Sequence, residues 1–250
     1  MNQPLPADIL SHGGAYASLD RRVDIFDAPR FSLCTEGSAR RLAVERFIEH
    51  QFFRSYGAIL REYLPYLIFM ETQTGMAAAS GFALAVEKNP LFLERYLGAS
   101  VEDVLSERVG SVVRRNQIAE VGNLAGSTFG AQHIGSSRLL YIILASTLAS
   151  AGLEWMVFTA TTPLLNSLKR LGLSPVDLGA ASELSLAPSE RQRWGSYYDH
   201  GPRVAAAPLS NASESIRSRA QFAAIQEHYG EVILAMARQV SDLSGAKSDD

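Results

Sequence analysis

The chain has 250 residues, a net charge of −3 and a sequence pI of about 6.0, which argues against a general nucleic-acid-binding protein because such proteins usually carry a basic face. Hydrophobic residues make up 47% and charged residues 20%, an ordinary globular composition. The single cysteine, Cys34, excludes a disulfide framework within the chain and favours a reducing, cytoplasmic location. The first residues lack the pattern of a secretory signal, and no apolar run is long enough for a stable membrane insertion.

Three segments differ in character along the chain. Residues 1–38 are polar and punctuated by Gly and Pro, which predicts an extended arm or a disordered leader. Residues 39–210 alternate between apolar runs and turn residues, which predicts an α/β domain. Residues 211–250 predict a C-terminal helix and a disordered tail.

The middle segment alternates between helix and strand patterns. Apolar residues spaced by three and four predict helices over Arg40–Tyr56, Pro90–Ser106, Ser136–Ala151 and Thr162–Leu171. Short apolar runs predict strands over Tyr63–Thr72, Ala77–Val86, Gln117–Leu124 and Glu154–Thr161, and another strand-like stretch begins at Pro175. The sequence TQTGM predicts a hairpin turn between the first two strands. This order predicts a mixed sheet flanked by helices.

The C-terminal segment has one amphipathic pattern over Ser213–Leu243. We expect this helix to pack on the body of the protein or on a second subunit of a homodimer. A position on a membrane surface is the weaker alternative, because its charges are mixed in sign whereas membrane-surface helices are usually rich in Lys and Arg.

A Gly- and Ser-rich loop, Gln132–Ser137, opens the helix Ser136–Ala151. A helix N-terminus presents N–H groups without partners and the positive end of a dipole, and small residues let an anion approach the backbone. The loop lacks the Gly-Lys-Ser/Thr element of a Walker loop and is not a Gly-x-Gly-x-x-Gly motif. The sequence of the loop alone leaves a phosphate site and a plain helix cap as alternatives.

The context of this loop resembles that of GNAT-type N-acyltransferases, whose Gln/Arg-x-x-Gly-x-Gly/Ala loop holds the pyrophosphate of the acyl carrier. The matching residues are Gln132, Gly135 and Ser137, with Ser137 in place of Gly or Ala. Four further blocks resemble the thermostable hemolysin family: LFLERYL from Leu91, EVGNLA from Glu120, WMVFTAT from Trp155 and WGSYY from Trp194. The resemblance covers roughly residues 38–208, with the blocks in the family's order.

The resemblance implies a GNAT-like, mostly antiparallel sheet, in a layout similar to that of autoinducer (acyl-homoserine lactone) synthases. It implies transfer of a fatty acyl chain from acyl carrier protein or acyl-CoA to a small amine or amino-acid-like acceptor. The thioester donor is then a co-substrate, with no tightly bound cofactor. The resemblance also implies a set of donor-binding residues: Leu124, Ala125, Gly126, Gln132, Gly135, Ser136, Ser137 and Asn166.

The acceptor nitrogen must lose a proton, which requires a general base or a water relay. Glu120 is a charged residue within an apolar strand, which indicates catalysis or acceptor binding, with a structural ion pair as the alternative. Asn123 could anchor the acceptor or the backbone, or be a bulge residue. Strict alternation places Asn123 on the face opposite Glu120, and a bulge at Gly122 would change that.

Glu94 lies one turn from Leu97 and is a candidate acceptor-binding acid, with an ordinary core helix as the alternative. Trp194 and Tyr198 could line an acceptor pocket or cover a core edge. The resemblance makes Tyr197 or Tyr198 a candidate acid for the leaving thiolate, and we assign the role to Tyr197.

The five histidines are scattered without metal-ligand spacing, so we expect no metal site. Two other functions stay open: a membrane-active, hemolysin-type protein without enzymatic activity, and a GNAT-like module that binds the donor without turnover. The sequence does not identify the amine, the acyl length or the choice between carrier protein and CoA. Arg114, Arg115 and Arg138 suggest a surface for an acidic carrier protein.

Overall fold

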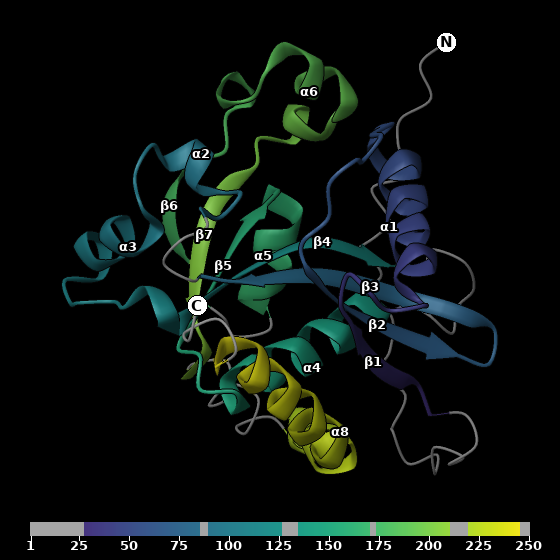
Figure 1. Cartoon of the computed structure of the whole chain (residues 1–250). Helices are drawn as coiled ribbons and strands as arrows, with labels where there is room; N and C mark the ends of the chain where they lie inside the picture. Colours follow the sequence, from purple (N-terminus) through teal and green to yellow (C-terminus); the bar gives the residue numbers. More distant parts are fainter. Residues whose placement is uncertain (1–27, 86–89, 127–134, 171–173, 211–219, 246–250) are drawn as a thin grey trace.

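The computed structural model describes residues 28–85, 90–126, 135–170, 174–210 and 220–245. Seven strands form one sheet in the order β1-β2-β3-β4-β5-β7-β6 (Figure 1). Their bounds are Arg30–Cys34 (β1), Tyr66–Thr72 (β2), Gly75–Leu84 (β3), Ile118–Gly126 (β4), Trp155–Ala160 (β5), Val176–Ala180 (β6) and Arg203–Pro208 (β7). Every neighbouring pair is antiparallel except β4–β5, which is parallel. The predicted mixed and mostly antiparallel sheet is therefore confirmed.

Helices cover both faces of this sheet (Figure 1). The α-helices are Arg41–Tyr56 (α1), Glu94–Leu97 (α2), Val101–Val109 (α3), Ser136–Ser150 (α4), Thr162–Arg170 (α5), Pro188–Arg193 (α6) and Ala220–Gly245 (α8). Buried residues of α4 and α8 share one core with the first face of the sheet. The second face has two cores, one under α1 and one under α2 and α3.

Strand β4 shows how alternation divides its residues between these cores. Ala119 and Val121 point to the α4 and α8 side. Ile118 points to the α2 and α3 side. Glu120 and Gly122 share the face of Ile118 by the same alternation, so the Glu120 carboxyl group lies on the face that α1, α2 and α3 cover.

The C-terminal helix α8 packs on the body of the protein. Its buried residues Ile233, Met236 and Val240 recur every three to four positions and join the core of α4. The Tyr229 ring packs edge-on against Phe31 of β1, with 5.0 Å between ring centroids. The predicted amphipathic helix is confirmed from residue 220 onward, and its apolar face is covered by the same chain.

Two strands and one helix break differ from the expectations. Strand β1 lies within residues 1–38, so the end of the predicted leader is an edge strand of the sheet. Strand β7 was not predicted, because its Ala-rich sequence RVAAAP has low β-propensity. The single helix expected over Pro90–Ser106 is wrong: Gly98 at φ 67° ends α2, and α3 begins at Val101.

The expected hairpin is confirmed, with Thr72 and Gly75 as the last pair before its turn.

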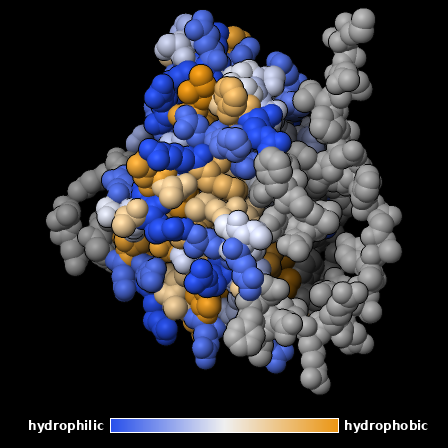
Figure 2. Space-filling view, turned by 90° about the vertical axis from the view of Figure 1, so that its right-hand side faces the viewer, coloured by the Kyte–Doolittle hydropathy of each residue, from blue (hydrophilic) through white to orange (hydrophobic). Residues whose placement is uncertain are grey.

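Figure 2 shows the side of the molecule at the right of Figure 1, where hydrophobic side chains gather across the middle and hydrophilic ones lie above and below. On α1, Leu42 and Phe53 are more than half exposed. Within the described ranges no helix has the length and apolar character that crossing a bilayer requires.

Candidate active site

The parallel strands β4 and β5 pair over four residues and then part. The pairs run from Ile118 with Trp155 to Val121 with Phe158. Beyond them β4 continues to Gly126 and pairs with β3 alone among the described strands. We call this opening the β4–β5 fork. The backbone of β4 past Val121 therefore presents peptide groups toward β5 without a strand partner, which suits an extended ligand.

A β-bulge bends β4 at the fork. Asn123 and Leu124 together lie opposite Ser80 of β3. Asn123 has a φ of 52° and is the one non-glycine residue with positive φ in the part of the chain that the structure describes. The extra residue sends Leu124 toward the α4 core, while Ala125 returns to the α1 core.

The bulge also decides where Asn123 points. Strict alternation would put its side chain opposite Glu120, but the bulge turns the side chain onto the Glu120 face, toward Gly81 and Leu64. Its Oδ1 atom accepts a hydrogen bond from the Leu64 backbone N–H at 3.1 Å. Asn123 thus anchors backbone, one of the roles that the sequence left open.

Helix α4 begins beside the end of β4. Gly135 precedes the helix at φ 105°, and no side chain caps the helix start. A β-carbon on Gly126 would overlap Ser137 Oγ, so strand end and helix start lie in contact. The expected donor-binding residues Leu124, Ala125, Gly126, Gly135, Ser136 and Ser137 are therefore brought to one end of the fork.

The two other expected donor-binding residues, Gln132 and Asn166, are not seen at this end of the fork. Gln132 lies outside the described residues. Asn166 is exposed on α5, the helix that directly follows β5.

Glu120 is only 4% exposed. Its Oε2 atom accepts a hydrogen bond from the Phe92 backbone N–H at 2.7 Å, and Oε1 accepts one from Leu93 at 3.2 Å. Burial raises the pKa of Glu120 to about 7, since the two hydrogen bonds only partly offset the cost of a buried charge. A carboxyl group with this pKa exchanges protons near neutrality, as a general base must.

Glu94 is held by the protein itself. It accepts hydrogen bonds from the backbone N–H groups of Leu91 and Val101 at 2.8 and 2.9 Å, and it pairs with Arg115 at 2.5 Å. Burial alone would raise the pKa of Glu94, but these hydrogen bonds outweigh it and hold the pKa below its ordinary value. This network fixes the starts of α2 and α3, so the geometry favours a structural role over the expected acceptor binding.

The expected basic surface for a carrier protein does not form from its three arginines. Arg115 also pairs with Glu102 at 2.6 Å. Arg114 and Arg115 lie immediately before β4, whereas Arg138 lies in the first turn of α4 beside the other end of that strand. A nine-residue strand spans about 30 Å, so of these three arginines only Arg138 lies near the end of β4 where α4 begins.

Seven aromatic side chains form a connected cluster between α1 and α2, which we call the aromatic cluster. Its Phe, Tyr and Trp members are Phe52, Tyr56, Phe92, Tyr96, Trp194, Tyr197 and Tyr198, and the His200 ring packs on Tyr56 at its edge. The segment that carries Trp194 is fixed to the end of α1, where Ser196 N–H donates to the Tyr56 carbonyl at 2.9 Å. Gly195 is required there, because a β-carbon would overlap the same carbonyl.

The two candidate tyrosines occupy different parts of the aromatic cluster. Tyr197 packs against Tyr56 and Trp194, with ring centroids 5.2 and 5.1 Å away. Burial raises the pKa of Tyr197 well above its ordinary value. The Tyr198 hydroxyl lies 2.6 Å from that of Tyr96, which is on the segment that Glu120 holds through Phe92. The structure therefore connects Tyr198 to Glu120 through the segment that carries Phe92 and Tyr96, whereas Tyr197 has no such contact with this segment among those described above. Spacing along the sequence does not reveal this connection.

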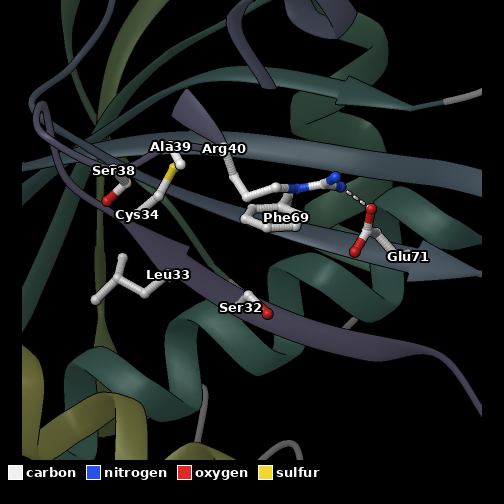
Figure 3. Close-up of a pocket in the computed structure, with 8 residues that line it drawn as sticks. All are labelled: Ser32, Leu33, Cys34, Ser38, Ala39, Arg40, Phe69 and Glu71. Atoms are coloured by element: carbon white, nitrogen blue, oxygen red, sulfur yellow. Dashed lines mark hydrogen bonds and ion pairs between the residues drawn. The ribbon is translucent and has the colours of Figure 1, made fainter. Parts of the chain in front are cut away.

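A separate pocket lies at the β1 edge of the sheet (Figure 3). Its lining residues are Ser32, Leu33, Cys34, Ser38, Ala39, Arg40, Phe69 and Glu71. Arg40 pairs with Glu71 and places its guanidinium over the Phe69 ring. Strand β3 separates this pocket from β4, so the pocket is not part of the fork.

Within the described ranges there is no group of three or more His, Cys, Asp or Glu side chains placed to bind a metal ion.

Comparison with known proteins shows the family of the chain. Residues 34–213 match the thermostable hemolysin family. The chain belongs to this family. The match begins at the end of β1 and ends just beyond β7, so it includes β4, β5 and the aromatic cluster. No curated protein matches the sequence at a significant level.

Two solved structures share the fold of this thermostable hemolysin family member. FeeM, an N-acyl amino acid synthase from uncultured soil microbes, aligns with a TM-score of 0.52 at 12% identity over 75% of this chain and 95% of its own. The AHL synthase LasI aligns with a TM-score of 0.51 at 11% identity over 73% of this chain and 91% of its own. The expected GNAT-like fold is confirmed.

Proposed function

We propose that this chain is an N-acyltransferase that moves a fatty acyl group from a thioester donor to the amine of a small amino-acid-like acceptor. The observation that carries the proposal is the placement of Glu120. A buried carboxyl group with a raised pKa lies on β4, one residue before the β4–β5 fork opens. The start of α4 lies at the fork's far end.

The donor's pantetheine arm lies along the fork. Its amide groups pair with the backbone of Leu124 to Gly126, as an added strand would. Its phosphate lies at the start of α4, where the N–H groups and the helix dipole favour an anion. This arrangement places the thioester near the opening of the fork, beside Glu120.

The reaction then needs one base and one stabilised leaving group. The acceptor nitrogen attacks the thioester carbonyl carbon; the C–N bond forms, the C–S bond breaks, and Glu120 takes the proton that the nitrogen loses. The thiolate accepts a hydrogen bond from a tyrosine hydroxyl of the aromatic cluster and then takes a proton from solvent. Glu120 returns the proton that it took to solvent, which restores the base. Burial raises the pKa of Tyr197, so its hydroxyl stays protonated and serves as donor of this hydrogen bond.

The donor is acyl carrier protein or acyl-CoA, since both present the same pantetheine thioester to the fork. The amino-acid-like acceptor is supported by the shared fold with an N-acyl amino acid synthase and by the polar side chains on the Glu120 face. The acceptor approaches from the side of the aromatic cluster. Trp194 and Tyr198 lie there, next to the segment that Glu120 holds.

The test combines purified protein, acyl-CoA and acyl carrier protein donors of several chain lengths, and a panel of amino acids and amines. Free thiol is followed with time, and products are identified by mass. We expect thiol release that depends on an amine and a product heavier than the amine by the acyl group. Thiol release without an amine-linked product would indicate a hydrolase instead. Donor binding without any thiol release would indicate a binding module.

A further inference from the structure

Thr159 lies at the β4–β5 fork, one residue beyond the last pair that joins the two strands, Val121 with Phe158. Along β5, Met156 and Phe158 belong to the α4 side. Val157 belongs to the α2 and α3 side. By alternation the Thr159 side chain shares the face of Val157, and this is also the face of Glu120.

The Thr159 hydroxyl is shielded from solvent and has no hydrogen-bond partner in the part of the chain that the structure describes. A buried hydroxyl without a partner is costly, so native proteins keep few of them, and one at a functional site is a candidate for ligand binding. Two other hydroxyls share this condition, those of Tyr141 and Thr147. Both belong to α4, a helix that packs on the opposite face of the sheet.

Glu120 and Thr159 are diagonal neighbours across the fork. Glu120 pairs with Val157, and Thr159 follows two residues later on the same face. Parallel strands lie about 4.8 Å apart and two residues span about 6.6 Å along a strand, so Cα atoms in this diagonal relation are about 8 Å apart. A small molecule whose nitrogen reaches the Glu120 carboxylate can therefore place an oxygen on its next carbon near the Thr159 hydroxyl.

We infer that Thr159 binds the acceptor, and that its hydroxyl donates a hydrogen bond to the carboxyl or carbonyl oxygen of an α-amino acid or its derivative. This assignment rests on the proposed acyl transfer. It explains why a hydroxyl is buried without a partner at this point of the sheet: the partner is the acceptor. It also gives the amino-acid-like acceptor of the proposed function a specific contact, between Thr159 and an oxygen on the carbon next to the amine-bearing carbon.

The test uses three variants and two kinds of acceptor. Thr159→Val keeps the side-chain shape and removes the hydroxyl, Thr159→Ser keeps the hydroxyl, and Thr147→Val removes a matched buried hydroxyl on α4. Each standard amino acid is compared with the amine that lacks its carboxyl group. The KM for the acceptor and the KM for the donor are each determined from rates of thiol release. Binding of the acceptor alone is measured by ligand-observed NMR without donor.

We expect Thr159→Val to raise the KM and weaken the binding of the amino acid about tenfold, with the donor KM unchanged and no effect on the decarboxylated amine. Thr159→Ser restores tight binding, and Thr147→Val changes neither value. Equal amino-acid binding in wild type and Thr159→Val overturns this inference while leaving acyl transfer intact. Wild-type protein that binds amino acids through Thr159 but releases no thiol overturns the proposed function instead. A wild type that neither binds an amino acid nor releases thiol contradicts both.

Discussion

The Oε2 atom of Glu120 lies 2.7 Å from the backbone nitrogen of Phe92, and this hydrogen bond joins the middle of β4 to the segment that leads into α2. The same carboxyl group is the candidate base. In the proposed mechanism Glu120 therefore holds one wall of the site and also takes the proton from the acceptor. These two roles have separate signatures, one in stability and one in rate.

The raised pKa of Glu120 makes the stability of the fold depend on pH. The pKa rises from 4.5 to about 7 on folding, so the folded chain binds more protons than the unfolded chain between these values. The free energy of unfolding therefore falls as the pH rises from about 4.5 to about 7, by up to about 3 kcal/mol. Urea denaturation of wild type and Glu120→Gln at about pH 5 and about pH 8 measures this difference. Equal pH dependence in the two proteins would show that Glu120 is not the titrating group.

We expect the rate of acyl transfer to rise with pH over the range in which the ionisation of Glu120 lowers the free energy of unfolding. A base must be deprotonated, so kcat/KM rises with pH and levels off above about 7, where the pKa of Glu120 lies. Glu120→Gln lowers kcat by about 10²- to 10⁴-fold and removes this rise, while donor binding persists. Glu107→Gln, an exposed acid on α3, is the matched control and keeps full activity. An unchanged pH–rate profile in Glu120→Gln would remove Glu120 from the mechanism.

The bulge at Asn123 gives a prediction about stability. Replacement by Gly removes the hydrogen bond to Leu64 but tolerates the φ of 52°, whereas replacement by Ala loses the bond and also strains the backbone. The Ala variant should be less stable than the Gly variant by about 1 kcal/mol. Thermal unfolding of both proteins gives the comparison. A more stable Ala variant would mean that the left-handed conformation is not kept in solution.

The contact between Gly126 and Ser137 joins the end of β4 to the start of α4, where we propose that the donor arm and its phosphate lie. A methyl group at residue 126 would overlap Ser137 Oγ, so Gly126→Ala should displace the Ser137 side chain at the start of α4 and raise the donor KM by about tenfold. The double variant Gly126→Ala/Ser137→Ala removes the overlapping oxygen and should recover most of the loss. Equal donor KM values for the wild type and the single variant would place the donor elsewhere.

The roles of Tyr197 and Tyr198 in the aromatic cluster can be separated by conservative substitution. Tyr198→Phe breaks the 2.6 Å contact with Tyr96 and should lower stability by about 1 kcal/mol and raise the acceptor KM. Tyr197→Phe should lower kcat and leave the acceptor KM unchanged, if its hydroxyl meets the leaving sulfur. Steady-state kinetics with both substrates varied distinguishes the two. A fall in kcat in Tyr198→Phe alone would reassign the hydrogen bond to Tyr198.

Sequence periodicity predicted the elements that carry strong local patterns. The helices α1, α4 and α8 and the strands β2 to β5 were expected from their apolar spacing, and Glu120 was expected on a strand. The short edge strand β1 and the Ala-rich β7 carry too weak a local pattern, since their stability comes from neighbouring strands.

The partners within the site could not be predicted in the same way. Phe92 meets Glu120 from 28 residues away, and Tyr198 meets Tyr96 from 102 residues away. Sheet order and bulges set such contacts, and spacing along the chain does not contain them. Thr159 was missed because its significance lies in a hydroxyl without a partner, which only the packed structure reveals.

The family name makes membrane activity the main alternative to acyl transfer, and liposome leakage tests it. We expect no leakage from vesicles exposed to purified wild-type protein alone. If lysis depends on a product of the reaction, leakage appears only with acyl donor and acceptor present, and Glu120→Gln abolishes it. Leakage by protein alone that is equal in wild type and Glu120→Gln would support a membrane-active protein without enzymatic activity.

The most direct measurement of acyl transfer is time-resolved thiol release from acyl-CoA and acyl carrier protein donors, with mass identification of the product, in wild type and Glu120→Gln. The account predicts an amine-dependent release of thiol with an N-acyl product, lost in Glu120→Gln although the variant is folded. Folded wild-type protein that releases no thiol with any donor and any amino acid, or a Glu120→Gln variant as fast as wild type, would contradict it.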